Sequence, residues 1–152
     1  MAIDFDEFKI LSPITWSTGG NSCVDNLRRA LMSNIVTGEE ASASAIYRPN
    51  PNNLWVNRLI MGNHQELLWV KFEPGSRYRL HSHPYEQTSV VVQGRMRLTV
   101  GEEVREVGPG DMWHARANVP HGGEILGDEA VIFIDVYSPP SEGDTSSVTY
   151  YG

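Results

Sequence analysis

Three histidines and one glutamine carry the metal-binding chemistry that this sequence offers. Side chains alternate across a β-strand, so His81 and His83, two residues apart, emerge on the same face of one strand. Gln87 follows Pro84, which ends that strand, so a hairpin can turn its carboxamide back toward the two imidazoles. The spacing predicts a single metal ion held by these side chains, namely His81, His83, Gln87 and His121.

The types of these ligands limit the ion and its chemistry. Neutral imidazoles suit Zn, Ni, Cu and Fe, whereas an amide oxygen is a harder ligand that tolerates Mn or Fe. Three histidines and one glutamine add no negative charge, so the ion keeps its full charge and favours Lewis-acid chemistry on a carbonyl or hydroxyl oxygen. We expect one divalent metal ion as the cofactor, Mn, Fe, Zn or Ni, with positions left open for substrate. The alternative is a histidine cluster that binds no metal.

The scaffold that must position these ligands is β-rich. Short apolar runs separated by Gly, Pro and Asp are typical of the strands of an antiparallel sandwich or a small barrel. The predicted strands are Leu54–Met61, Glu66–Glu73, Tyr78–His83, Thr88–Gln93, Arg95–Val100, Glu103–Val107, Asp111–Ala115 and Ala130–Tyr137. The fold class is therefore all-β, with residues 54–140 as the barrel, residues 1–53 as an N-terminal arm with a short helix, and residues 141–152 as a C-terminal tail.

The short helix is expected over about Val24–Asn34. Ser22, with Asp25 three residues later, resembles a helix N-cap. The apolar residues that recur at helical spacing are Val24, Leu27, Leu31 and Ile35. Barrels of this size often pair through their sheet faces, and this arm is suited to covering or extending a partner's sheet, so we expect a homodimer.

Composition and charge narrow the partners and the location. The chain has 152 residues, a net charge of −7 and a sequence pI near 5.1, and its Lys and Arg do not cluster, so neither nucleic acid nor an anionic membrane is an expected partner. The acidic start lacks an apolar core of signal length, and no apolar run approaches membrane-spanning length. The single cysteine, Cys23, excludes an internal disulfide and fits a reducing compartment. We therefore expect a cytoplasmic protein with a small-molecule substrate.

The spacing around the first two histidines resembles the first motif of the cupin family. That motif is a Gly, five residues, His-x-His, three or four residues, an acidic ligand, six residues and a Gly. The residues that fall on it are Gly75, His81, His83 and Gly94. Gln87 stands in the place of the acidic ligand.

A second cupin motif is matched in part. It runs from a Gly through a variable gap to Pro-x-Gly-x-x-His; Gly101 can open it and His121 closes it, while Arg116 stands where the Pro would be. The resemblance covers roughly Gln65–Pro140. It implies the double-stranded β-helix of cupins, a jelly-roll barrel.

Three segments carry a narrower resemblance: His81-Ser-His-Pro-Tyr-Glu-Gln87, Asn118-Val-Pro-His-Gly122 and Ile134-Asp-Val-Tyr-Ser-Pro139. Together they are similar to the small cupins of uronate breakdown, which ring-open unsaturated sugars derived from pectin or alginate. That group is implied to use three His and a Gln on the metal, with an Asp-x-aromatic pair on the last strand, matched here by Asp135 and Tyr137. In that group an Arg follows the Ser-Pro, where this chain has Ser141. The arginines that could replace it are Arg77, Arg79 and Arg97.

Three residues are predicted to act on the substrate, namely Asp135, Tyr137 and Arg79. Asp135 has the strand parity to face the barrel interior with Phe133, where desolvation raises the pKa of a carboxyl and a nearby cation lowers it, so it is a candidate acid or base. A buried Asp held by an Arg for structure is the alternative. Tyr137 can hydrogen-bond a substrate or fill the barrel mouth. Arg79 shares parity with His81 and can bind an anionic group, or else form a surface salt bridge.

These residues favour a metal-dependent lyase or isomerase acting on a small oxygenated metabolite. The metal would bind a hydroxyl or carbonyl oxygen while Asp135 moves a proton beside it. Cupins that cleave cyanohydrins also resemble this chain in using a Gln. An Fe(II)-dependent dioxygenase is a second class, because open coordination positions beside three His also suit oxygen chemistry. A non-catalytic metabolite-binding cupin is the third.

Overall fold

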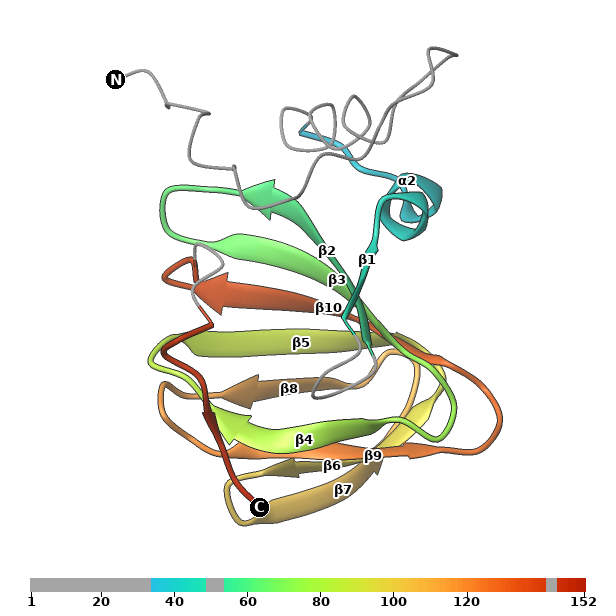
Figure 1. Ribbon diagram of the computed structural model, residues 1–152, viewed down its shortest axis with the longest axis vertical. Coiled ribbons are helices and arrows are strands. Elements are labelled where there is room, and N and C mark those ends of the chain that lie inside the picture. The colour runs from blue at the N-terminus through green and yellow to red at the C-terminus, as the bar shows by residue number, and fades with distance from the viewer. Residues whose placement is uncertain (1–33, 49–53, 142–144) are drawn as a thin grey trace.

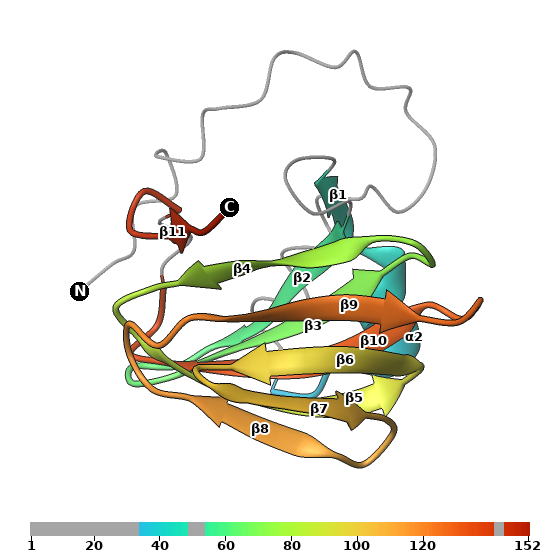
Figure 2. The same cartoon turned by 90° about the horizontal axis from the view of Figure 1, so that it is seen from below.

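Two antiparallel sheets face each other in the computed structural model, which describes residues 34–48, 54–141 and 145–152 (Figures 1 and 2). In spatial order, the six-stranded sheet contains β1 (Ile46–Arg48), β2 (Leu54–Met61), β3 (Glu66–Phe72), β10 (Val131–Ser138), β5 (Glu86–Gln93) and β8 (Met112–Ala115). The five-stranded sheet contains β11 (Thr149–Tyr150), β4 (Arg77–Ser82), β9 (His121–Leu126), β6 (Arg95–Val100) and β7 (Glu103–Val107). This arrangement confirms the predicted all-β, double-stranded β-helix.

The eight predicted strands are all present, with ends that differ by no more than two residues, but β1, β9 and β11 were missed; β9 belongs to the barrel itself. Its Gly122-Gly123 pair weakens the strand pattern because glycine is disfavoured within strands. In the structure both glycines allow close backbone approach. A Cβ on Gly122 would lie 2.6 Å from the Tyr78 carbonyl oxygen, and one on Gly123 would lie 2.5 Å from the Arg97 carbonyl oxygen.

The helix expected over Val24–Asn34 falls, apart from its last residue, outside the described residues, and the homodimer stays a prediction. The structure instead shows α2 (Gly38–Ala43), which the sequence did not predict. Thr37 and Glu40 form a capping box at its start, in which each side chain accepts a hydrogen bond from the other residue's backbone N–H. No helix within the described part of the chain is long and apolar enough to cross a membrane.

Apolar side chains fill the space between the two sheets. The largest fully buried ones come from both, and they include Phe72, Val91, Met96, Val131 and Phe133. Along β10 the side chains alternate: Phe133 and Asp135 face this core, whereas Ile132 and Ile134 pack on the other side of the sheet, in the cluster that contains Ala41 of α2. The interior position predicted for Asp135 is confirmed.

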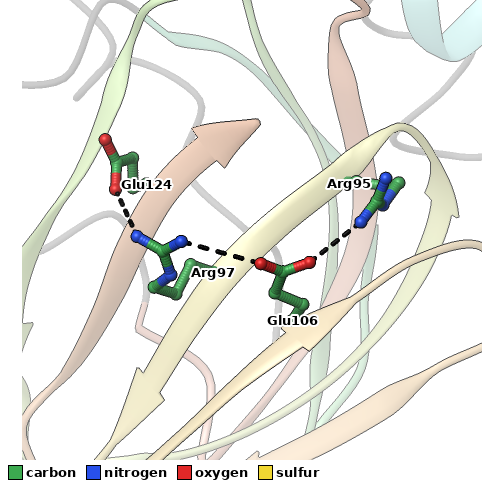
Figure 3. A network of polar contacts seen from close by, with 4 residues as sticks. All are labelled: Arg95, Arg97, Glu106 and Glu124. Atoms are coloured by element: carbon green, nitrogen blue, oxygen red, sulfur yellow. Dashed lines mark hydrogen bonds and ion pairs between the residues drawn. The ribbon is translucent and has the colours of Figure 1, made fainter. Parts of the chain in front are cut away.

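The outer face of the five-stranded sheet carries charged residues instead (Figure 3). The Arg97 guanidinium lies 3.2 Å from Glu124 and 3.6 Å from Glu106, and Arg95 lies 2.8 Å from the same Glu106. All four side chains are between about half and two-thirds exposed, so each pair contributes at most about 1 kcal/mol. Arg97 therefore belongs to the outside of the barrel.

Gly94 closes the turn between β5 and β6 and is expected to be the least tolerant of substitution among the glycines in the described ranges. Its φ is +76°, and a Cβ there would lie 2.5 Å from the Ala130 carbonyl oxygen. Gly110 has a φ of +91° but nothing within 4 Å of an added Cβ, so it isolates the conformational cost. We expect Gly110→Ala to lower the free energy of unfolding by about 1 kcal/mol and Gly94→Ala by about 3 kcal/mol, measured by urea denaturation. Equal losses would show that the close approach at Gly94 has no energetic weight.

Candidate metal centre

Three buried histidines meet at one end of the barrel. His81 lies in β4 directly opposite His121, the first residue of β9, and His83 follows β4. One ring nitrogen from each lies within 4.8 Å of those of the other two. The Asn118 backbone N–H donates to the His83 carbonyl oxygen at 2.7 Å, which ties the loop before β9 to the loop after β4. The structure thus brings together the three predicted histidines, which can hold a metal ion.

A register shift in β4 helps to place His81. Tyr78 pairs with Gly123 and His81 pairs with His121, so β4 has one residue more than β9 between these pairs, as in a β-bulge. Tyr78 and His81 therefore both face the interior although they are three residues apart, and their ring centroids are 5.1 Å apart. The bulge thereby places the Tyr78 ring in contact with the rings of His81 and His121.

Backbone carbonyl oxygens set the tautomers of the three clustered histidines. Each Nδ1 lies within hydrogen-bond distance of one carbonyl oxygen, and because a carbonyl can only accept, each Nδ1 must carry the hydrogen. The partners of His81, His83 and His121 are, respectively, the carbonyl oxygens of Arg79 (2.8 Å), Tyr85 (2.8 Å) and Val119 (2.9 Å). Each Nε2 is left with a free lone pair, which is the form that binds metals.

Burial keeps these imidazoles neutral. Desolvation lowers the pKa of His81 to about 4 and that of His121 to about 3, and it also lowers the pKa of His83. The three neighbouring rings reinforce the effect, because protonating one of them disfavours charge on the others. Metal binding at neutral pH therefore needs no proton to be removed from a histidine.

Gln87 places its amide oxygen beside the histidine nitrogens. Its Oε1 lies 3.1 Å from His83 Nε2 and 3.1 Å from His121 Nε2. Because both nitrogens lack a hydrogen in this tautomer, neither contact is a hydrogen bond: each joins two atoms that carry lone pairs. The Nε2 atoms of the three histidines and Oε1 of Gln87 therefore direct four lone pairs toward one buried point. A cation resolves that arrangement, so His81, His83, His121 and Gln87 fit a divalent metal ion.

A hydrogen-bond network lies behind Gln87. Its Nε2 is 2.9 Å from Asp135 Oδ1, 3.1 Å from Ser89 Oγ and 3.3 Å from the Tyr78 hydroxyl. Ser89, which pairs with Asp135 across β5 and β10, donates a short hydrogen bond to the same Oδ1. Burial raises the pKa of Asp135 to about 7, although the hydrogen bonds from Ser89 and Gln87 act in the opposite direction. Asp135 is thus a buried carboxyl on the side of the Gln87 amide that faces away from the histidines.

Three tyrosines lie beside the histidines. The Tyr85 ring stacks on His83 with centroids 3.9 Å apart, and Tyr137 lies 5.3 Å from His83 and 4.8 Å from Tyr85. Desolvation, and secondarily Asp135, raise the pKa of Tyr137 well above its usual value, so its hydroxyl stays protonated and can donate a hydrogen bond. Tyr150 of β11 lies 5.7 Å from His81, because the C-terminal tail pairs with β4.

Arg79 is placed differently from its prediction. Its Nη2 donates to the Gly152 carbonyl oxygen at 2.8 Å, and its Cζ lies 5.1 Å from the centroid of Tyr150. The parity that it was predicted to share with His81 is wrong, because the β4 bulge falls between Tyr78 and His81. The role assigned to Arg79 loses that premise, so it stays a prediction without geometric support.

The position that holds an Arg in the uronate-type cupins is part of another contact here. The Ser141 backbone N–H and hydroxyl donate to Oε2 of the fully buried Glu66, at 2.8 and 3.0 Å. Glu66 pairs with Tyr137 across β3 and β10, so this contact anchors the chain after β10 close to the tyrosines.

Sequence reasoning missed several residues of the site. Ser89 could have been found, since it lies two residues after Gln87 and shares its face of β5. Tyr78 could not have been found, because simple alternation along β4 places it on the face opposite to His81 and only the bulge brings both to the same face. Tyr150 could not either, because its position depends on a pairing between residues far apart in the sequence.

Comparison with known proteins agrees with this architecture. Residues 68–137 match the family model of a cupin domain. The chain belongs to the cupin superfamily. The matched residues include Asp135 and all four candidate ligands, so the candidate metal centre lies within the cupin domain.

Solved structures and a curated relative resemble this cupin at low identity. An RmlC-like cupin from Shewanella frigidimarina NCIMB 400 is 22% identical with a TM-score of 0.62, covering 74% of this chain and 96% of that chain. KdgF from Halomonas sp. is 27% identical with a TM-score of 0.55, covering 59% of this chain and 82% of that chain. Oxalate decarboxylase OxdC of Bacillus subtilis (strain 168) is 26% identical over 83 residues, which are 51% of this chain. This cupin spans 21% of the length of that decarboxylase.

Removal of one imidazole should abolish tight metal binding. We expect His121→Ala to lower the bound metal per chain at least about tenfold after dialysis against Mn, Fe, Zn or Ni, because it removes one of four ligands. His114→Ala is the matched control, since His114 is about half exposed on β8 and lies 3.7 Å from Glu86. Elemental analysis of the dialysed proteins gives the result. Full metal content in His121→Ala would place the ion elsewhere.

The raised pKa of Asp135 should appear in the pH dependence of stability. The folded state binds this proton with a pKa of about 7, against 3.8 as its ordinary value, so ionisation costs folding free energy as pH rises through that window. Asn at this position has no such cost. We expect the stability of metal-free Asp135→Asn relative to the wild type to increase as pH rises from about 4 to about 7, measured by chemical denaturation. The histidines, whose lowered pKa values oppose this trend, are common to both proteins and cancel in the difference.

The same substitution at Asp128, in the exposed turn before β10, controls for the general loss of a negative charge. A difference between wild type and Asp135→Asn that stays constant over the whole pH range would contradict the raised pKa.

Proposed function

We propose that this cupin is a metal-dependent lyase or isomerase that acts on a small oxygenated metabolite. The observation that carries the proposal is the convergence of three neutral imidazole nitrogens and the Gln87 oxygen beside a buried carboxyl, Asp135. A divalent ion held by these four residues would supply Lewis-acid polarisation of a substrate carbonyl or hydroxyl oxygen. The four ligands add no negative charge, which preserves the polarising power of the ion.

Asp135 is the residue suited to move a proton. Because its pKa is raised to about 7, both its protonated and its ionised forms are populated near neutral pH, as general acid–base catalysis requires. Its Oδ1 already accepts hydrogen bonds from Gln87 and Ser89. We assign the transferable proton to the other carboxyl oxygen, Oδ2.

Tyr137 is the residue suited to hold the substrate oxygen. It stands two residues after Asp135 on the same face of β10, next to His83 and Tyr85. Its raised pKa keeps the hydroxyl protonated, so it can donate a hydrogen bond to a substrate oxygen that gains negative charge. The aromatic rings around it limit the access of water to the reacting groups.

Two resemblances support this class of reaction. The Asp135–Tyr137 pair, together with three His and a Gln, matches the set implied by the uronate ring-opening cupins, so unsaturated uronates are the first substrates to test. The curated relative is an oxalate decarboxylase, which shows that a related cupin domain occurs in an enzyme of small oxygenated acids. The substrate itself remains part of the proposal.

Asp135→Asn should separate catalysis from metal binding. We expect it to lower turnover of an unsaturated uronate about 100-fold or more, because the amide cannot exchange a proton, while the bound metal per chain stays unchanged. Loss of the ultraviolet absorbance of the conjugated double bond measures turnover, and Asp128→Asn is the control. Full activity in Asp135→Asn would remove its proposed role.

The same assays distinguish the other two classes. Substrate-dependent oxygen uptake that ceases under anaerobic conditions would replace the proposal with a dioxygenase. Binding of a metabolite without conversion, in a protein loaded with metal, would replace it with a binding module.

A further inference from the structure

Gln87 can serve as a metal ligand in only one of two orientations. Its amide group exposes an oxygen on one side and a nitrogen on the other, and a half-turn of the group exchanges them with almost no change in shape. With Oε1 toward the imidazoles it offers a lone pair. With Nε2 toward them it would donate to the histidine lone pairs and offer the ion nothing. Something other than shape must therefore select the orientation.

The histidine side of the amide does not select it. The three Nε2 atoms are acceptors in their neutral tautomers, so in the absence of an ion they would favour the nitrogen of Gln87. The hydroxyls of Ser89 and Tyr78 on the opposite side do not select it either, because a hydroxyl can donate or accept.

Asp135 is the partner that does discriminate. Oδ1 of Asp135 accepts from Ser89 and lies 2.9 Å from Gln87 Nε2, so it offers Gln87 only a lone pair, whether or not the other carboxyl oxygen carries a proton. The inverted amide would bring its oxygen against this carboxylate in a space from which water is excluded, where such repulsion is strong. Ser89 holds Asp135 in place through its hydrogen bond to the same Oδ1.

We propose that Asp135 is a positioning residue for the metal centre: its carboxylate fixes the Gln87 amide so that Oε1 faces the three imidazoles. Gln87 and Asp135 thus act as a unit built from neighbouring strands. The inference rests on the metal centre of the proposed function but not on proton transfer by Asp135. It also gives a reason for Gln rather than a carboxylate at position 87, since Glu would place two carboxylates in contact.

Cobalt(II) binding tests the proposal without any substrate. Cobalt(II) chloride is titrated into the chelator-treated full chain, and the visible absorption of the bound ion reports both affinity and ligand field. We expect Asp135→Ala to weaken binding about 10- to 100-fold, the range seen when a group that orients a metal ligand is removed. Asp135→Asn can present either its oxygen or its nitrogen to Gln87, so its cobalt affinity should fall between those of the wild type and Asp135→Ala.

A Glu at position 87 separates orientation from packing. A carboxylate presents an oxygen in either orientation and needs no group to orient it. In the Gln87→Glu background, Asp135→Ala should therefore no longer weaken cobalt binding. Equal losses in the Gln and Glu backgrounds would show that Asp135 acts by packing alone, and they would overturn the proposal.

Two further measurements keep the outcome clear. If Asp135→Ala does not fold, as judged by circular dichroism, Asp135→Ser replaces it, because its hydroxyl fills part of the space but cannot dictate the direction of the amide. Wild-type cobalt affinity in Asp135→Ala or Asp135→Ser would overturn the positioning role. Retained turnover in Asp135→Asn would instead overturn the proton-transfer role of the proposed function and leave the positioning role intact. A wild type that binds no cobalt would overturn both the metal centre and the positioning role.

Discussion

The structure of this cupin depends on keeping four lone-pair donors together in a dry space. Three histidine Nε2 atoms and one amide oxygen meet without a hydrogen between them, and without a cation such atoms repel one another. Hydrogen-bond acceptors around the site hold these side chains by binding the hydrogens of each imidazole and of the amide on the side away from the lone pairs. Backbone carbonyls keep the hydrogens of the imidazoles on Nδ1, and Asp135 keeps the amide hydrogens of Gln87 turned away.

The strands supply the rigidity that this arrangement requires. His81 and His121 face each other across β4 and β9, whose close approach depends on the absence of a side chain at Gly122. Gln87 and Asp135 come from β5 and β10, which pair over most of their length in the opposite sheet. The ion would therefore join the two sheets at one end of the barrel, where its binding would also stabilise the fold.

Several features followed from local pattern alone. Alternation of apolar and polar residues, with Gly and Pro between the runs, placed eight strands, and the spacing of His81, His83 and Gln87 identified the cluster. Local pattern failed where one strand depends on its neighbours. β9 contains two glycines that are needed only because the backbones of β4 and β6 approach them closely. The bulge in β4 placed Arg79 on the opposite side of the strand from the one expected.

The sequence by itself determined the types of the ligands and their positions on the strands, because those depend on residue chemistry and on a period of two. Only the tertiary structure decided what stands behind each ligand. Asp135 meets Gln87 across 48 residues of chain, and Tyr150 reaches His81 through a strand formed near the C-terminus. Such contacts depend on strand register. Register is set by the burial of one face of each strand when the two sheets pack against each other, and a short segment of sequence does not contain that information.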